Sequence, residues 1–146
     1  MRSSPGVGRR RGIAAAATAA LAANGWDLLL THWRPYNEKV PFPAGPNDPA
    51  DLAEALESEG AGVALHEDDL ADSQAPGRIM DAAEAAFGVG SVRGLVNTAA
   101  HSTTDDILSV TAESFDQHTR VNARGTLLLT QEFARRFEHD SGAGMS

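Results

Sequence analysis

The chain of 146 residues has no cysteine, few aromatic residues and a shortage of basic residues. Without cysteine it has no disulfide, no thiolate metal ligand and no cysteine nucleophile. Its 12 lysines and arginines are outnumbered by 20 acidic residues, which gives a formal net charge of −8. This balance argues against nonspecific nucleic-acid binding, because such binding needs a basic surface. The chain is long enough for one globular domain with a hydrophobic core.

Signals for metal binding and for membranes are also weak. The five histidines are scattered, with no pair at ligand spacing on a helix, so we expect no metal site. No apolar run is long enough to span a bilayer, so we expect no membrane partner and a cytoplasmic location. One alternative stays open. Arg9–Arg11 followed by Ile13–Ala23 resembles the basic and apolar regions of a signal peptide, so residues 1–23 can also be interpreted as a secretion signal.

Helical and strand patterns alternate along the chain. Helices are predicted at residues 13–23, 48–58, 72–87 and 111–137, with a short helical piece at 105–110, and strands at 26–32, 61–66 and 92–98. In the last long helix, Phe115, Val121, Leu128 and Phe133 are expected on one apolar stripe. Residues 34–49 form a proline-rich loop, and residues 138–146 are expected to be a flexible tail. This alternation predicts right-handed βαβ units and an open parallel sheet.

A glycine-rich loop stands at the front of this pattern. Gly6, Gly8 and Gly12 precede Ile13 and the alanine-rich helix. Glycines let a backbone approach phosphates closely, and a helix N-terminus offers unpaired N–H groups to negative charge. The loop therefore predicts a pyrophosphate site. Such a loop follows a buried strand in a doubly wound sheet, and here we expect that strand to be missing, because only Met1–Pro5 precedes it.

Four segments in order carry a family resemblance. They are Gly6–Ala14, Asp69-Leu70, Asn97-Thr98-Ala99-Ala100 and Asn122 within Arg120–Thr126. Together they resemble the short-chain dehydrogenase/reductase family, over about Gly6 to Phe137. The chain resembles the N-terminal, cofactor-binding half of a member of the 3-oxoacyl-acyl-carrier-protein reductase type, and is expected to be truncated at both ends. Pro5 and Ala14 depart from the family's glycine loop, and two of the four positions at Asn97–Ala100 depart from its Asn-Asn-Ala-Gly motif.

The resemblance implies an α/β fold in a single partial dinucleotide-binding domain over residues 1–146. Its sheet is expected to be a partial Rossmann-like, doubly wound parallel sheet that lacks the first strand and the C-terminal strands. The implied cofactor is NADP or NAD. The residues expected to bind it are Gly6, Gly8, Gly12, Ile13, Arg34, Asp69, Leu70, Asn97 and Ala99.

Arg34 bears on the choice of cofactor. It follows the predicted second family strand, where an acidic residue bonds the ribose 2′-hydroxyl of NAD and an arginine accommodates the 2′-phosphate of NADP. The residue therefore favours NADP. An ordinary solvated loop arginine explains it equally well.

The catalytic residues of the family are a tyrosine, a lysine four residues later and a serine. The chain has one tyrosine, Tyr36, and one lysine, Lys39, at a spacing of three in the proline-rich loop. They do not form the catalytic pair. The family's set also includes an asparagine that kinks the long helix and supports a proton-relay water. Asn122 matches it as a remnant, and its expected role in this chain is to support a kink in its helix. The family activity is NAD(P)H-dependent carbonyl reduction or alcohol oxidation, on a small carbonyl substrate in a complete homologue, and we expect none from this chain.

Two further expectations follow from this interpretation. Without its central strand the sheet would expose unpaired edges, so the chain is expected to be poorly stable. The alternative to an enzyme is a non-enzymatic remnant that binds nucleotide or dimerises. Residues 111–137 would then form the interface of a homo-oligomer, as the corresponding helix does in family members.

Overall fold

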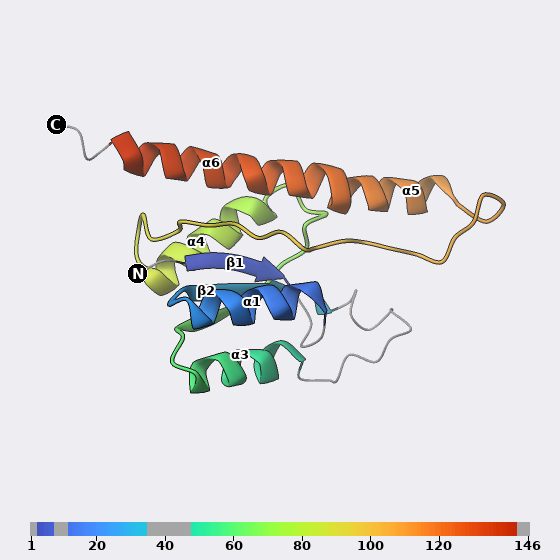
Figure 1. Ribbon diagram of the computed structural model, residues 1–146. Coiled ribbons are helices and arrows are strands. Elements are labelled where there is room, and N and C mark those ends of the chain that lie inside the picture. The colour runs from blue at the N-terminus through green and yellow to red at the C-terminus, as the bar shows by residue number, and fades with distance from the viewer. Residues whose placement is uncertain (1–2, 8–11, 35–47, 143–146) are drawn as a thin grey trace.

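The computed structural model describes residues 3–7, 12–34 and 48–142. Within these ranges it has a three-stranded parallel sheet in the order β1-β2-β3 (Figure 1). The strands are β1 (Ser3–Val7), β2 (Asp27–His32) and β3 (Val63–Glu67). The helices are α1 (Ile13–Ala23), α3 (Asp48–Ser58), α4 (Ala75–Phe87), α5 (Ala112–His118) and α6 (Thr126–Gly142), with the π-helix η1 (Thr119–Gly125) between the last two.

The core lies on both faces of β2. Leu28 and Leu30 belong to one cluster, which includes residues of α1 and α3. Leu29 belongs to the other, which includes residues of α4 and α6. Successive side chains of a strand point to opposite faces, so a continuous apolar run is buried on both sides. Helices cover both faces of the sheet, and α6 packs against α4 as an outer layer. The predicted doubly wound α/β architecture is confirmed.

The strand expected to be missing is present. β1 pairs in parallel with β2, with Ser3 opposite Asp27 and Val7 opposite Thr31. The prediction of an unfilled gap is wrong, and the instability expected from that gap loses its basis. The sequence did not predict this strand, because Pro5 and Gly6 have low strand propensity. It exists because β2 offers a complete edge to pair with, which is a tertiary effect.

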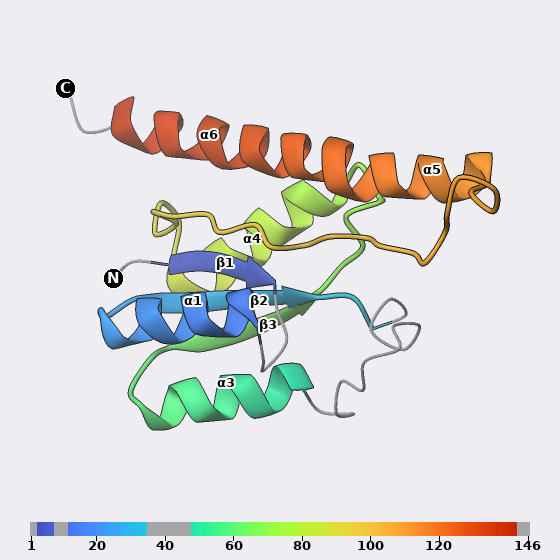
Figure 2. The ribbon, with the colours of Figure 1, turned by 45° about the vertical axis from the view of Figure 1, so that its right-hand side comes forward.

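Residues 92–98, predicted to be a strand, form no regular strand. Only Val92 and Val96 stand at isolated bridge positions. The segment runs extended beside β1 in both views (Figures 1 and 2), and Val92 is buried in the core. The segment therefore lies where a strand was expected but lacks regular strand hydrogen bonding.

Several element ends differ from prediction. The segment 105–110, expected to be helical, is a turn. The Asp106 carboxylate accepts hydrogen bonds from the amides of Leu108 and Ser109, and these local bonds stabilise the turn in place of a helix. α4 begins at Ala75 rather than Asp72. The flexible tail predicted from residue 138 is wrong over residues 138–142, where α6 continues, and residues 143–146 lie outside the described ranges.

The apolar stripe predicted for the long helix is only partly correct. Val121 and Phe133 pack against the core, but the buried leucine is Leu129, 2% exposed, rather than the predicted Leu128. Phe115 is 65% exposed. The π-helix η1 takes more residues per turn than an α-helix, so the apolar faces on its two sides fall out of phase. A stripe drawn at a uniform helical period therefore fails across η1.

Candidate functional site

The parallel strands all end at one edge of the sheet, and α1 begins at that edge (Figures 1 and 2). In open α/β sheets, ligands bind in the crevice outside the carboxyl ends of the strands. The candidate site is therefore this carboxyl edge. Gly6 lies in β1, next to its end, and Gly8 lies outside the described residues.

Gly12 is the N-cap of α1 and has a φ of 110°. Only glycine adopts this backbone conformation without strain. A Cβ built on Gly12 would meet no described atom within 4 Å, so open space adjoins the start of the helix. No side chain caps α1, and its first turn has no acidic residue. The first amides of the helix therefore have no side-chain cap among the described residues, and Ile13 beside them is 83% exposed.

Arg34 lies just beyond β2, as predicted, and it is paired with an acidic residue. Its Nε and Nη2 donate to Glu67 Oε2 at 2.9 and 2.6 Å, and its backbone amide is 3.4 Å from Oε1. Hydrogen bonding to Arg34 lowers the pKa of Glu67, so this carboxylate is ionised at neutral pH. The pair arises because β2 and β3 are parallel neighbours whose register places His32 opposite Glu67.

His32 lies beside Glu67, its partner in the register of β2 with β3. Burial lowers the pKa of its imidazole despite the opposing charge of Glu67. Its Nε2 is 3.9 Å from Glu67 Oε2. Its Nδ1 is buried with no hydrogen-bond partner in the described part of the chain. His32 is therefore neutral at pH 7 and adds no positive charge to the edge.

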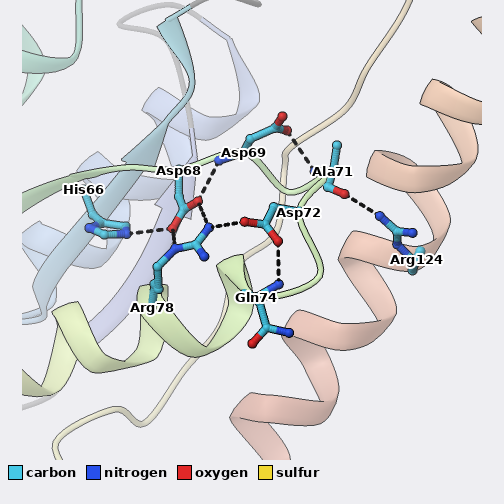
Figure 3. Close-up of polar contacts among 8 residues, drawn as sticks. All are labelled: His66, Asp68, Asp69, Ala71, Asp72, Gln74, Arg78 and Arg124. Carbon is cyan, nitrogen blue, oxygen red and sulfur yellow. Dashed lines mark hydrogen bonds and ion pairs between the residues drawn. The ribbon is translucent and has the colours of Figure 1, made fainter.

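A second polar cluster follows β3 (Figure 3). Arg78 of α4 donates two hydrogen bonds to Asp68, at 2.8 and 2.6 Å, and one to Asp72 at 2.8 Å. His66 Nε2 lies 3.2 Å from Asp68. Burial alone would raise the pKa of Asp68, but its hydrogen bonds from Arg78 and His66 outweigh this and lower it. Asp69, predicted to contact the cofactor, accepts the amide of Ala71 and so shapes the loop.

Acid is expected to weaken this cluster. The pKa values of Asp68 and Asp72 lie below their ordinary values, the latter because of its hydrogen bonds from Gln74 and Arg78. Their contribution to stability is therefore complete above about pH 5 and is lost as the pH falls below about 4. We expect the urea midpoint of Arg78→Met to lie below that of the wild type at pH 6, and the difference to shrink steadily as the pH falls below about 4. In the control Arg120→Met, which removes an arginine without a described ion pair, the midpoint should follow the wild type. A midpoint difference for Arg78→Met that does not change with pH would contradict the assignment.

The loop after β3 is bound to η1. Arg124 donates a hydrogen bond to the carbonyl of Ala71 (Figure 3). Gly125 is buried against the Leu70 carbonyl, so closely that a Cβ would lie 2.6 Å from that oxygen. The side chain of Leu70 is in the core. The Leu70 side chain is therefore held in the core, and a cofactor contact by Asp69 or Leu70 stays a prediction.

Asn97 and Asn122 organise the extended segment beside β1. Asn97 donates to the Thr126 hydroxyl at 2.9 Å and accepts the amide of Ala99 at 3.1 Å. Asn122, in η1, accepts the amide of His101 at 2.7 Å and donates to its carbonyl at 2.9 Å. Asn122 thus fixes the chain just after the Asn97–Ala100 motif. It lies within the π-helix, and its expected role in supporting a kink stays a prediction.

Sequence reasoning missed Glu67, His32 and Arg124. Glu67 had a usable signal, because it directly follows the strand predicted at 61–66, whose parallel neighbour ends near Arg34. His32 and Arg124 had none, since their roles depend on the register of β2 with β3 and on η1. Tyr36 and Lys39 lie outside the described residues. Within the described residues no group of three or more metal-ligating side chains could hold an ion, and no helix is both long and apolar enough to cross a membrane.

Comparisons with known proteins agree with this geometry. The model of the family described as enoyl-(acyl carrier protein) reductase matches residues 6–145. The chain belongs to the short-chain dehydrogenase/reductase family. Its resemblance to members of the 3-oxoacyl-acyl-carrier-protein reductase type is confirmed, and so is the Rossmann-like fold.

Three relatives show the extent of the match. The uncharacterized oxidoreductase YjdA of Bacillus subtilis (strain 168) is 31% identical over 133 residues, which cover 91% of this chain and 49% of YjdA. A short-chain dehydrogenase/reductase from Serratia marcescens BCRC 10948 is 26% identical with a TM-score of 0.76, covering 92% of this chain and 50% of that one. A 3-oxoacyl-[acyl-carrier protein] reductase from Brucella melitensis, in complex with NAD, is 29% identical with a TM-score of 0.71, covering 92% and 48%. The chain thus spans about half the length of these relatives.

Proposed function

We propose that this family member binds a nicotinamide dinucleotide, NAD or NADP, along the carboxyl edge of its sheet. It would serve as the cofactor-binding half of an oxidoreductase that reduces small carbonyl compounds or oxidises the corresponding alcohols. The observation that carries the proposal is the start of α1, where Gly12 adopts a glycine-only conformation beside open space. A relative of 29% identity has been solved in complex with NAD.

The residues of the edge fit such a cofactor. The first amides of α1 have no side-chain cap, so they can donate to a pyrophosphate. Arg34 and Glu67 stand at the ends of neighbouring strands, where a ribose hydroxyl can find both a donor and an acceptor. Asn97 and Ala99 belong to the segment that follows Val92, where the Asn97 side chain accepts the amide of Ala99, and we propose that both contact the cofactor. We propose the same for Gly6, Gly8, Ile13, Asp69 and Leu70.

We propose no turnover by this chain alone. A bound nicotinamide supplies hydride transfer, whereas proton transfer to a carbonyl oxygen needs a positioned acid. The chain's one tyrosine and one lysine have the wrong spacing for the family's pair. The Asn122 side chain hydrogen-bonds to the backbone of His101. We therefore propose that Asn122 positions this loop and takes no part in proton transfer. The contribution proposed for the chain is cofactor binding.

A second copy of the chain is the partner proposed for residues 111–137. Phe115 of α5 and Leu127 of α6 are both largely exposed on this helical run. Exposed apolar side chains of this size are typical of surfaces that pack against another protein. The oligomer stays a proposal.

Replacing Gly12 by alanine is expected to weaken NADH binding about tenfold, because a residue with a Cβ strains at a φ of 110° and the loop must move from the helix N-terminus. The control is Gly25→Ala, which also replaces a glycine of positive φ, 78°, but at the opposite end of α1. Titration of NADH fluorescence with each purified variant gives the two affinities. Equal weakening by both substitutions, or by neither, would contradict a phosphate site at Gly12.

A further inference from the structure

The ion pair between Arg34 and Glu67 bears on which dinucleotide this edge accepts. Arg34 alone favours NADP, because a guanidinium binds phosphate well. In the structure that guanidinium already donates two hydrogen bonds to Glu67 Oε2. A 2′-phosphate that reaches Arg34 therefore has to share it with, or take it from, a carboxylate.

Among the residues that the structure describes, the charges around the pair do not offset this competition. Glu67 is ionised, and the imidazole of His32 beside it is neutral because burial lowers its pKa. Asp68 follows Glu67 directly, and its partner Arg78 is shared with Asp72. Within the described residues, the ends of β2 and β3 thus present no arginine that is free of a carboxylate. A phosphate dianion meets repulsion here, whereas ribose hydroxyls meet a good acceptor.

We propose that Glu67 determines cofactor preference in this chain by holding Arg34, so that the edge binds NAD more tightly than NADP. This rests on the proposed function, because it assumes that the dinucleotide lies along the carboxyl edge. Glu67 would accept a hydrogen bond from the ribose 2′-hydroxyl of NAD, as an acidic residue after the second strand does in dinucleotide-binding folds. Here the carboxylate comes from β3 rather than from the end of β2. Arg34 then acts as the partner that orients this carboxylate.

The test measures equilibrium binding of NADH and NADPH to the full chain by cofactor fluorescence. Wild type should bind NADH more tightly. Glu67→Gln keeps the shape but removes the charge and frees Arg34, so the ratio of affinities should shift toward NADPH by about five- to tenfold. The gain should shrink at high salt, because the freed attraction is electrostatic and exposed. The control Glu54→Gln makes the same charge change on α3, away from the edge, and should leave the ratio unchanged.

The double variant Arg34→Ala/Glu67→Gln separates this mechanism from simple charge removal. If Glu67 acts by occupying Arg34, the shift toward NADPH disappears when Arg34 is absent. An unchanged ratio in Glu67→Gln, a wild-type preference for NADPH, or a full shift in the double variant each overturns the inference alone. A folded wild-type chain that binds neither cofactor overturns the proposed function and the inference with it.

Discussion

Gly125→Ala is expected to lower the free energy of unfolding by about 2–3 kcal/mol. The added Cβ would lie 2.6 Å from the Leu70 carbonyl oxygen and 3.2 Å from that of Arg120. Both are backbone atoms, so neither can move aside by changing a rotamer. Relief requires η1 and the loop after β3 to separate, which also disturbs Asn122. Urea unfolding followed by circular dichroism measures the loss.

Gly77→Ala is the matched control. Gly77 lies within α4, and a Cβ there meets nothing within 4 Å. The same substitution should therefore stabilise the chain by about 0.5–1 kcal/mol, since alanine is the better helix former. The opposite signs of the two effects distinguish close packing from helix propensity. A neutral or stabilising Gly125→Ala would show that η1 does not lie against Leu70 as described.

Arg136→Met is expected to lower the free energy of unfolding by about 2 kcal/mol, between the values typical of exposed and buried ion pairs. Arg136 of α6 donates to Glu132 at 2.9 Å, and to Glu84 and Asp81 of α4 at 2.7 Å each. Burial alone would lower the pKa of Arg136, but its hydrogen bonds and the nearby carboxylates outweigh this and raise it. The residue joins the outer helix to the layer that covers the sheet.

Its neighbour provides the control. Arg135 is exposed and has no ion pair among the described residues, so Arg135→Met should change stability by no more than about 0.5 kcal/mol. Since Arg136 is only partly buried, the effect of its replacement should shrink in high salt. Equal unfolding midpoints for the two variants would contradict a role for Arg136 in holding α6 on α4.

The features that could be predicted are those determined by nearby residues. The alanine-rich α1, the apolar run of β2 and the Thr111 cap, which accepts the Ser114 amide, follow from local sequence. β1 could not be predicted, because Pro5 and Gly6 disfavour a strand and only pairing with β2 produces one.

The site shows the same division. Gly12 could be predicted to start a helix at the edge, because glycine spacing and the alanine run are local signals. The partner of Arg34 could not, because Glu67 lies 33 residues away and meets it only through the register of β2 with β3. Asn122 was singled out from a motif. Its hydrogen bonds to the backbone of His101 could not be predicted, because they depend on the position that the π-helix gives to Asn122.

The central claim is that a nicotinamide dinucleotide binds along the carboxyl edge. Titration of the isotope-labelled chain with NADH, followed by amide NMR shifts, tests it residue by residue. The account predicts saturable shifts at Gly12, Ile13, Asp69 and Ala99, with the amides of Gly25 and Gly60 at the far ends of α1 and α3 unmoved. An absence of saturable shifts in the folded chain, or shifts confined to Gly25 and Gly60, would contradict it.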